Sequence, residues 1–229
     1  MRDLLTTQIP RLHDLISAEL DDVLSSAAKR VQYNDGQLIY KRGDASLGFT
    51  IVRSGSVRFG NLGSDGAYLL TSIADVGHCF GEFTLFSDLP RTHDSSALGA
   101  TTLDEIPAKQ FLNIYDKHVE LSKALLVISL SRTHEVLEFF DDMRRLPLNL
   151  RVAKFLLERS ETRDIDILQQ DLAFTFGVSR VAMGGALKKL ELNGFIQRGY
   201  SRITIQNADA LRQWVQEQLK LTPIGSQTA

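Results

Sequence analysis

The hydrophobic pattern of this chain changes at Pro107, and that change limits the folds it can adopt. From Val31 to Pro107 the apolar residues form short runs separated by turn-forming triplets such as Asn34-Asp35-Gly36 and Arg42-Gly43-Asp44. After Pro107 they recur at helical spacing. Many short strands at near-regular spacing are typical of an antiparallel sandwich or jelly roll. We therefore predict an α+β chain with an N-terminal β jelly-roll domain and a helical second half.

Composition excludes several classes of protein. Hydrophobic residues make up 43 % and charged residues 24 % of the chain, as in soluble proteins that bury a core. No apolar stretch approaches the roughly 18 residues of a membrane span, and the acidic N-terminal segment is not a signal peptide. The single Cys79 excludes an internal disulfide framework and a multi-cysteine zinc or iron–sulfur cluster. We expect a soluble, cytoplasmic protein with no membrane partner.

The helical half contains one long predicted helix, Glu120–Arg145. Along it a stripe of residues follows alternating spacings of four and three: Leu126, Leu130, Thr133, Leu137 and Phe140. This spacing is typical of a coiled-coil seam with one polar interruption, although a helix packed on its own β-domain can show a similar stripe. We predict a homodimer along this helix.

Pro147 ends the long helix, and Leu148-Asn149-Leu150 is the natural hinge that follows it. We therefore divide the chain into a β jelly-roll domain (1–119), a long dimerisation helix (120–146) and a C-terminal domain (147–229).

The C-terminal domain carries a pattern that is typical of DNA-binding proteins. Gly177 sits where a tight turn between two helices needs a positive φ, and Ser179 is a good N-cap for the second helix. This is helix-turn-helix spacing, in which the second helix enters the major groove of double-stranded DNA. Two β-runs about Gly199 then predict a wing. The residues predicted to contact DNA are Gln170, Ser179, Arg180, Val181, Gly184, Lys188, Arg198 and Arg202.

Charge supports this interpretation. From Leu146 to the C-terminus the chain has 11 Lys and Arg against 8 Asp and Glu, whereas the whole chain carries a net charge of −2. A basic segment in an acidic protein is a possible footprint for nucleic acid, and it is also typical of an ordinary solvated face.

A second group of polar residues lies between Gly77 and Thr92. Gly81 allows a backbone N–H to approach a phosphate, Arg91 offers a bidentate fork, and Glu82 can accept a hydrogen bond from a sugar hydroxyl. Thr92 adds a hydroxyl donor. The spacing fits a small anionic ligand, and it fits equally well a simple pair between Glu82 and Arg91.

The chain resembles the cAMP receptor protein / fumarate-nitrate reduction regulator (CRP/FNR) family of bacterial transcription factors. The segment FGEFTLFSDLPRT is similar to the family's phosphate-binding cassette, and FGVSR with LKKLELNGFI is similar to its winged helix-turn-helix. The resemblance implies a homodimer through the long helix, an effector in each cyclic-nucleotide-binding-like β-domain and a palindromic DNA operator. It also allows RNA polymerase as a partner.

The resemblance assigns roles within the cassette. Glu82 would contact the ribose 2′-hydroxyl, and Arg91 and Thr92 would bind the cyclic phosphate, while Phe80 and Gly81 line the same loop. The effector would be cAMP or another cyclic nucleotide. An effector-independent or differently liganded regulator is the alternative.

Two parts of the chain depart from the family pattern. Val136 and Leu137 stand where the best-known cAMP receptor offers Thr and Ser to adenine, which leaves Thr133 as a polar candidate nearby. In the recognition helix Arg180 matches the family's guanine-reading arginine, but Val181 replaces the usual Glu. The base pocket and the operator should therefore differ from the familiar ones.

Other classes fit less well. A haem sensor needs axial ligands, and His78 lies near the cassette without a second candidate. A cupin-like metalloenzyme needs two or three histidines on facing strands, but His78 and His93 flank a glycine–glutamate turn. A nucleotide-binding adaptor without DNA binding would lack the basic wing. We expect no enzymatic activity and no metal, haem or iron–sulfur cofactor.

Overall fold

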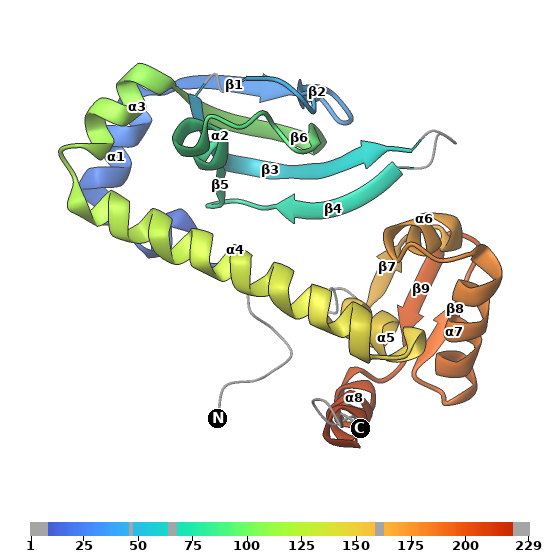
Figure 1. Ribbon diagram of the computed structural model, residues 1–229. Helices are drawn as coiled ribbons and strands as arrows, with labels where there is room; N and C mark the ends of the chain where they lie inside the picture. The colour runs from blue at the N-terminus through green and yellow to red at the C-terminus, as the bar shows by residue number, and fades with distance from the viewer. Residues whose placement is uncertain (1–8, 46–47, 64–67, 159–162, 222–229) are drawn as a thin grey trace. The chain divides into compact units, whose positions relative to one another are not determined.

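The computed structural model describes residues 9–45, 48–63, 68–158 and 163–221. The chain forms two compact units, one that ends at Thr133 and one that begins at His134. The boundary falls inside helix α4 (Val119–Arg145), which Figure 1 shows as one continuous ribbon. The predicted division of the chain after residues 119 and 146 stays a prediction.

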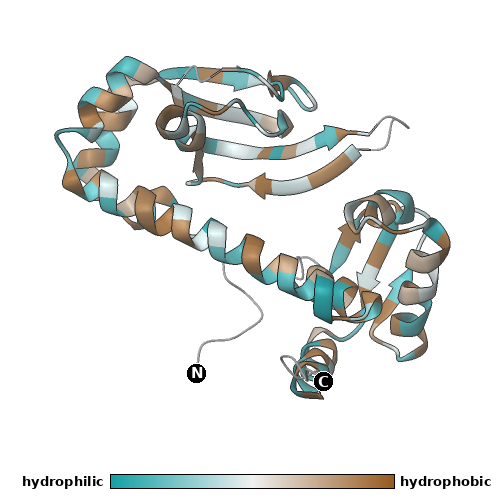
Figure 2. Ribbon diagram, in the orientation of Figure 1, coloured by the Kyte–Doolittle hydropathy of each residue, from teal (hydrophilic) through white to brown (hydrophobic). Residues whose placement is uncertain are grey.

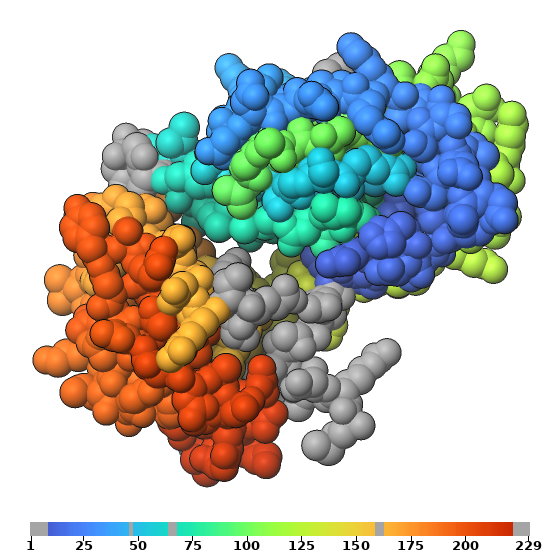
Figure 3. All heavy atoms as spheres, turned by 180° about the vertical axis from the view of Figure 1, so that it is seen from behind, coloured from blue at the N-terminus to red at the C-terminus, as the bar shows by residue number. Residues whose placement is uncertain are grey.

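An antiparallel sheet forms the centre of the first unit. Four of its strands lie side by side in the order β1 (Lys29–Tyr33), β6 (Asp94–Pro107), β3 (Gly48–Leu62) and β4 (Tyr68–Ala74). Of the two short strands, β2 (Leu38–Tyr40) pairs with β6 and β5 (Cys79–Phe80) pairs with β3. Green atoms of β6 lie between the blue N-terminal strands and the cyan β3 in Figure 3. The predicted β-domain is confirmed.

Helices cover one end of this sheet (Figure 1). They are the short 3₁₀ helix η1 (Leu12–Asp14), α1 (Ala18–Ala27), α3 (Ala108–Tyr115) and the first part of α4. Another short helix, α2 (Glu82–Ser87), follows β5 directly. Leucine, isoleucine and phenylalanine side chains from these helices and from β3 and β6 form the larger apolar cluster of the unit.

Strand β3 contributes to two apolar clusters, because successive residues of a strand point to opposite faces. Phe49 is fully buried among the helices, and its ring stacks on Phe111 with the centroids 4.2 Å apart. Thr50 points the other way, where its Oγ1 lies 3.3 Å from the Tyr40 hydroxyl. Tyr40 belongs to the second cluster together with Phe80. This second cluster underlies the segment that follows β5.

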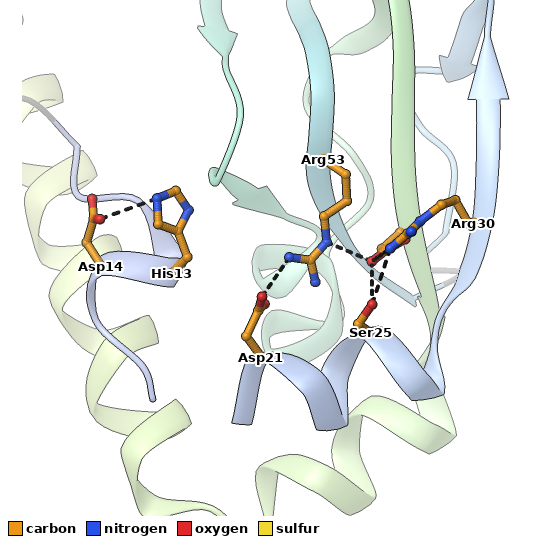
Figure 4. Close-up of polar contacts among 7 residues, drawn as sticks. His13, Asp14, Asp21, Ser25, Arg30 and Arg53 are labelled. Carbon is orange, nitrogen blue, oxygen red and sulfur yellow. Dashed lines mark hydrogen bonds and ion pairs between the residues drawn. The ribbon is translucent and has the colours of Figure 1, made fainter. Parts of the chain in front are cut away.

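A network of ion pairs ties α1 to the sheet. Asp104 of β6 is 1 % exposed and accepts hydrogen bonds from Arg30 Nε at 2.8 Å and Arg53 Nε at 2.7 Å. Arg53 also donates to Asp21 of α1 at 2.9 Å, and Figure 4 shows it between Asp21 and Arg30. Burial alone would raise the pKa of Asp104, but the bonds from the two arginines outweigh burial and lower that pKa.

The second unit is a winged helix-turn-helix domain preceded by the end of α4. Its elements are α5 (Leu148–Glu158), β7 (Asp164–Asp166), α6 (Gln169–Thr175), α7 (Arg180–Leu192), β8 (Ile196–Arg198), β9 (Arg202–Ile205) and α8 (Ala208–Leu221). The strands form an antiparallel sheet in the order β7-β9-β8. Gly177 has φ +61° in the turn between α6 and α7, as the sequence predicts. Side chains from all of these helices and strands share one buried core.

Apolar and polar residues alternate along the helices, including α4 (Figure 2). Within the described ranges, no helix combines the length and the apolar character needed to cross a membrane.

Candidate functional site

Arg91, which follows α2, is buried in an unusual environment. It is 8 % exposed, and its guanidinium carbon lies 3.7 Å from the centroid of the Tyr40 ring. Its backbone is fixed on both sides: its N–H donates to Asp44 O at 3.0 Å, and its carbonyl accepts from Gly43 N at 2.8 Å. Burial lowers the pKa of Arg91, because no solvent stabilises the cation there.

The Arg91 side chain has two buried donors without a partner, Nε and Nη2. These two nitrogens lie along the same edge of the planar guanidinium group and carry parallel N–H bonds. That edge binds two oxygens of one phosphate or carboxylate. A buried donor without a partner is costly, so the arrangement calls for an anionic ligand with two oxygens in one plane.

Glu82, the first residue of α2, is 7 % exposed and has one satisfied and one free oxygen. Its Oε1 accepts a hydrogen bond from Arg132 Nη1, and Arg132 Nη2 donates to Cys79 O at 2.6 Å. Its Oε2 is buried without a partner. Glu82 therefore pairs with Arg132 of α4, and the pair with Arg91 that the sequence allowed is not formed. The free oxygen can accept a hydrogen bond from a ligand hydroxyl.

Arg132 is the site residue that the sequence analysis missed. It connects α4 to the end of β5 and the start of α2, because it binds both the Cys79 carbonyl and the Glu82 carboxylate. The available signal was its position directly before Thr133, where a cation interrupts a largely apolar stretch of the long helix.

Gly81 and Phe80 shape the loop between β5 and α2. Gly81 has φ +107°, and a Cβ on it would lie 2.4 Å from the Gly48 carbonyl oxygen. A glycine is therefore required for β5 to pass close to β3, which is a different reason from the phosphate approach that the sequence suggested. The buried Phe80 ring meets Phe59 edge-on at 5.1 Å and Tyr40 at 6.2 Å. It forms part of the floor below Arg91.

The remaining predicted ligand contacts are less constrained. Thr92 is exposed, and its Oγ1 lies 2.8 Å from His93 Nδ1. Thr133 Oγ1 donates back to the Ser129 carbonyl at 2.9 Å. Val136 and Leu137 are 65 % and 61 % exposed and belong to the second unit, so their contact with a ligand stays a prediction.

The predicted recognition helix α7 is capped as expected, since Ser179 Oγ accepts from Ala182 N at 3.2 Å. Arg180 is exposed, and its Nη2 donates to Gln170 Oε1 of α6 at 2.8 Å. Val181 is 86 % exposed. These residues form an exposed polar and apolar surface along the start of α7, where DNA contact was predicted, and Lys188 is exposed two turns further on.

Gly184 is half-buried, and it faces α6. A Cβ at this position would lie 2.9 Å from Gln169 Nε2, which itself donates to the Arg180 carbonyl at 3.1 Å. The glycine therefore serves the close packing of α7 on α6, and its predicted contact with DNA stays a prediction.

Both wing arginines are already in ion pairs. Arg198 binds Glu191 of α7, with Nε and Nη2 at 2.8 and 2.7 Å from Oε2, and its hydrogen bonds lower the pKa of Glu191. Arg202 lies 2.7 Å from Asp166 and 3.5 Å from Asp164, both on β7. From the sequence both arginines were predicted as phosphate contacts. The carboxylates beside Arg202 were missed because β7 was not recognised as the neighbour of β9.

His78 has a structural role. Its Nε2 lies 3.2 Å from the Ile9 carbonyl oxygen, and its Nδ1 lies 3.1 Å from backbone atoms of Asp75. Both ring nitrogens are thus engaged by the backbone. Across the described ranges, no cluster of three or more His, Cys, Asp or Glu side chains is arranged to hold a metal ion.

Two domain families match the chain. Residues 30–118 match the cyclic nucleotide-binding domain, and residues 150–214 match the Crp-like helix-turn-helix domain. The first match covers the β strands and the Arg91 site, and the second covers the winged helix-turn-helix.

Two relatives align with most of the chain. The CRP-like cAMP-activated global transcriptional regulator of Mycobacterium tuberculosis is 22 % identical over 198 residues, covering 82 % of this chain and 88 % of the relative. The cyclic AMP receptor protein of Thermus thermophilus is 25 % identical over 207 residues, covering 89 % of this chain and 95 % of the relative.

The fold is also shared with solved structures. A CRP/FNR-family transcriptional regulator from Thermus thermophilus has a TM-score of 0.64 and 23 % identity, covering 82 % of this chain and 98 % of that one. The predicted fold class is confirmed, and these relatives are transcription regulators and not enzymes. With a cyclic nucleotide-binding domain followed by a Crp-like helix-turn-helix domain, the chain belongs to the CRP/FNR family of transcription regulators.

Proposed function

We propose that this regulator binds palindromic operator DNA as a homodimer and that a cyclic nucleotide, first of all cAMP, controls its DNA binding. The observation that carries the proposal is the buried edge of Arg91, where Nε and Nη2 have no partner. Two oxygens of a cyclic phosphate fit this edge. The names of the Mycobacterium tuberculosis and Thermus thermophilus relatives support cAMP as the nucleotide.

The net charge of the site favours a cyclic phosphodiester over a phosphate monoester. Arg91 and Glu82 are buried and Arg132 is half-buried, and the three side chains together carry one net positive charge. A cyclic phosphodiester with one negative charge balances it. A phosphate monoester carries about −1.5 to −2 at pH 7 and would leave excess negative charge away from water. The site should therefore bind cAMP in preference to 5′-AMP.

Glu82 supplies the second contact. Its free Oε2 would accept a hydrogen bond from the ribose 2′-hydroxyl, while its Oε1 stays bound to Arg132. Because Arg132 lies on α4, ligand binding at Glu82 would act on the long helix directly. Effector binding would thus bias a two-state equilibrium in which one state places two recognition helices about 34 Å apart, one turn of DNA.

The exposed stripe of α4 supports a dimer. Leu126, Leu130, Leu137 and Phe140 are each 57–61 % exposed, although large apolar side chains at regular spacing on a helix are normally covered. A second copy of α4 would cover them in a parallel coiled coil.

Isothermal titration with cAMP, cGMP and 5′-AMP tests the proposal. We expect one saturable site per chain for a cyclic nucleotide, weaker binding of 5′-AMP, and at least about a hundredfold loss of affinity in Arg91→Ala, which removes two charge-assisted hydrogen bonds. Arg58→Ala is the matched control, since Arg58 lies on β3 with its Nε bonded to Ser96. Absence of binding by both cyclic nucleotides would contradict the proposal, as would equal affinities in wild type and Arg91→Ala.

A further inference from the structure

Arg91 lacks the partner that a buried cation normally has. It is 8 % exposed, no ion pair is recorded for it within the described ranges, and two of its donors are unsatisfied. A buried charge without compensation is strongly destabilising. Its guanidinium lies over the Tyr40 ring, whose centroid is 3.7 Å from Cζ. The negative face of an aromatic ring attracts a cation at this distance.

Three neighbours hold Tyr40 in place. Its backbone N–H donates to Ser95 Oγ of β6 at 3.1 Å, and its hydroxyl lies 3.3 Å from Thr50 Oγ1 of β3. The Phe80 ring of β5 meets it edge-on, with an interplanar angle of 79°. Tyr40 is only 8 % exposed, so the orientation of its ring is fixed by packing as well as by these bonds.

An aromatic ring and a carboxylate would act on Arg91 in different ways. A carboxylate neutralises the guanidinium by taking the N–H bonds at its edge, which are the bonds that a ligand needs. A ring attracts the flat face of the guanidinium and leaves the edge open. The structure has the second arrangement, since Nε and Nη2 have no partner while the face rests on Tyr40.

We propose that Tyr40 is a positioning residue for the effector: its ring holds the Arg91 guanidinium flat, so that Nε and Nη2 keep no protein partner and can donate to the two phosphate oxygens of a cyclic nucleotide. This rests on the proposed function, because it assigns a role within the same site. Tyr40 does not touch the phosphate. Its contribution is to keep the arginine ordered, with Nε and Nη2 unpaired, before the ligand arrives.

Two substitutions of Tyr40 separate the ring from the hydroxyl. Tyr40→Phe keeps the aromatic face and should bind cAMP within about twofold of wild type. Tyr40→Leu removes the face and should weaken binding about tenfold, since a desolvated cation–π contact contributes roughly 1–2 kcal/mol. The tenfold loss should disappear in an Arg91→Ala background, where there is no guanidinium to position. Isothermal titration measures wild type, the three single variants and the double variant.

Tyr33→Leu is the matched control. Tyr33 packs against the same apolar cluster, but its hydroxyl donates to Glu105 at 2.6 Å and it makes no recorded contact with Arg91. We expect it to lower thermal stability without changing cAMP affinity. Equal losses of affinity in Tyr33→Leu and Tyr40→Leu would overturn the proposal, because the effect would then be a general weakening of the cluster. Equal affinities of Tyr40→Leu and Tyr40→Phe would also overturn it.

A readout without ligand separates this inference from the proposed function. Protons above an aromatic ring resonate upfield, so the Arg91 Nε–H signal should be shifted upfield in wild type and Tyr40→Phe but not in Tyr40→Leu. The signal is assigned by its absence in Arg91→Ala. If the shift is missing in wild type, the stacking is wrong, whatever the nucleotide affinity. If the shift is present but neither cAMP nor cGMP binds, the proposed function fails and the positioning role fails with it.

Discussion

Arg180, like Arg91, contacts an uncharged side chain. Its Nη2 donates to the amide oxygen of Gln170, which fixes the side chain without cancelling its charge. Arg198 differs from Arg180, because Glu191 neutralises its charge. At the residue scale, therefore, the arginines with neutral partners are the best candidates for reading a ligand or a base.

We expect Arg180→Ala to weaken binding to the operator by about 1–3 kcal/mol and to relax specificity at one base pair of each half-site. Lys188→Ala is the comparison, because a phosphate contact should weaken binding uniformly across sequences. Fluorescence anisotropy with operator and randomised duplexes measures both. An equal loss on both duplexes in Arg180→Ala would show that Arg180 contacts phosphate alone.

The residues that the sequence could not identify are those whose role depends on distant neighbours. Glu82, Arg91 and Gly81 form a local pattern, so the sequence alone makes them candidates. Arg132 acts on Glu82, which lies 50 residues away, and nothing in its own neighbourhood indicates that contact. Tyr40 lies on β2, and its position under Arg91 depends on how β2 pairs with β6, which its local sequence does not indicate.

At the scale of elements, helices and strands with strong local periodicity were predicted well. The long helix was expected over Glu120–Arg145 and runs over Val119–Arg145, because its repeat is visible within its own sequence. Strand β7 has only three residues and forms by pairing with β9, so its sequence alone gives no clear signal. Missing β7 is why the carboxylates beside Arg202 were overlooked.

The ion pairs of Asp104 join α1, β1, β3 and β6. Asp104→Asn should lower the free energy of unfolding by about 3 kcal/mol at pH 7, since it leaves two arginines without their buried partner. The folded state lowers the pKa of Asp104, so its stabilisation is present above the ordinary carboxyl pKa and is lost as pH falls through the folded pKa. Urea unfolding should therefore show a difference that shrinks below about pH 4.

The exposed Asp22 of α1 provides the control for this measurement. Asp22→Asn should change stability by less than about 0.5 kcal/mol, as is usual for surface substitutions. A difference between wild type and Asp104→Asn that stays constant from pH 7 to pH 3 would mean that the carboxylate charge is not the stabilising feature.

At the scale of the whole molecule, the stripe on α4 is the feature that a single chain leaves exposed. Leu130→Glu should convert the dimer into a monomer, because two such charges would face each other in the seam. Sedimentation should then give the 25.6 kDa of one chain, where wild type gives twice that mass. Glu138→Lys, outside the stripe, should leave the mass unchanged. A wild-type protein that sediments as a monomer at micromolar concentration contradicts the dimer.

The carboxylates beside the wing bear on how strongly the protein would bind DNA other than its operator. Arginines that are free of partners attract any stretch of DNA, and the strength of that attraction falls steeply as salt rises. Arg198 and Arg202 must exchange a carboxylate for a phosphate, so they add little to this general attraction. We expect such a regulator to bind non-operator DNA more weakly, and its operator occupancy to depend less on salt, than one whose wing arginines have no carboxylate partners.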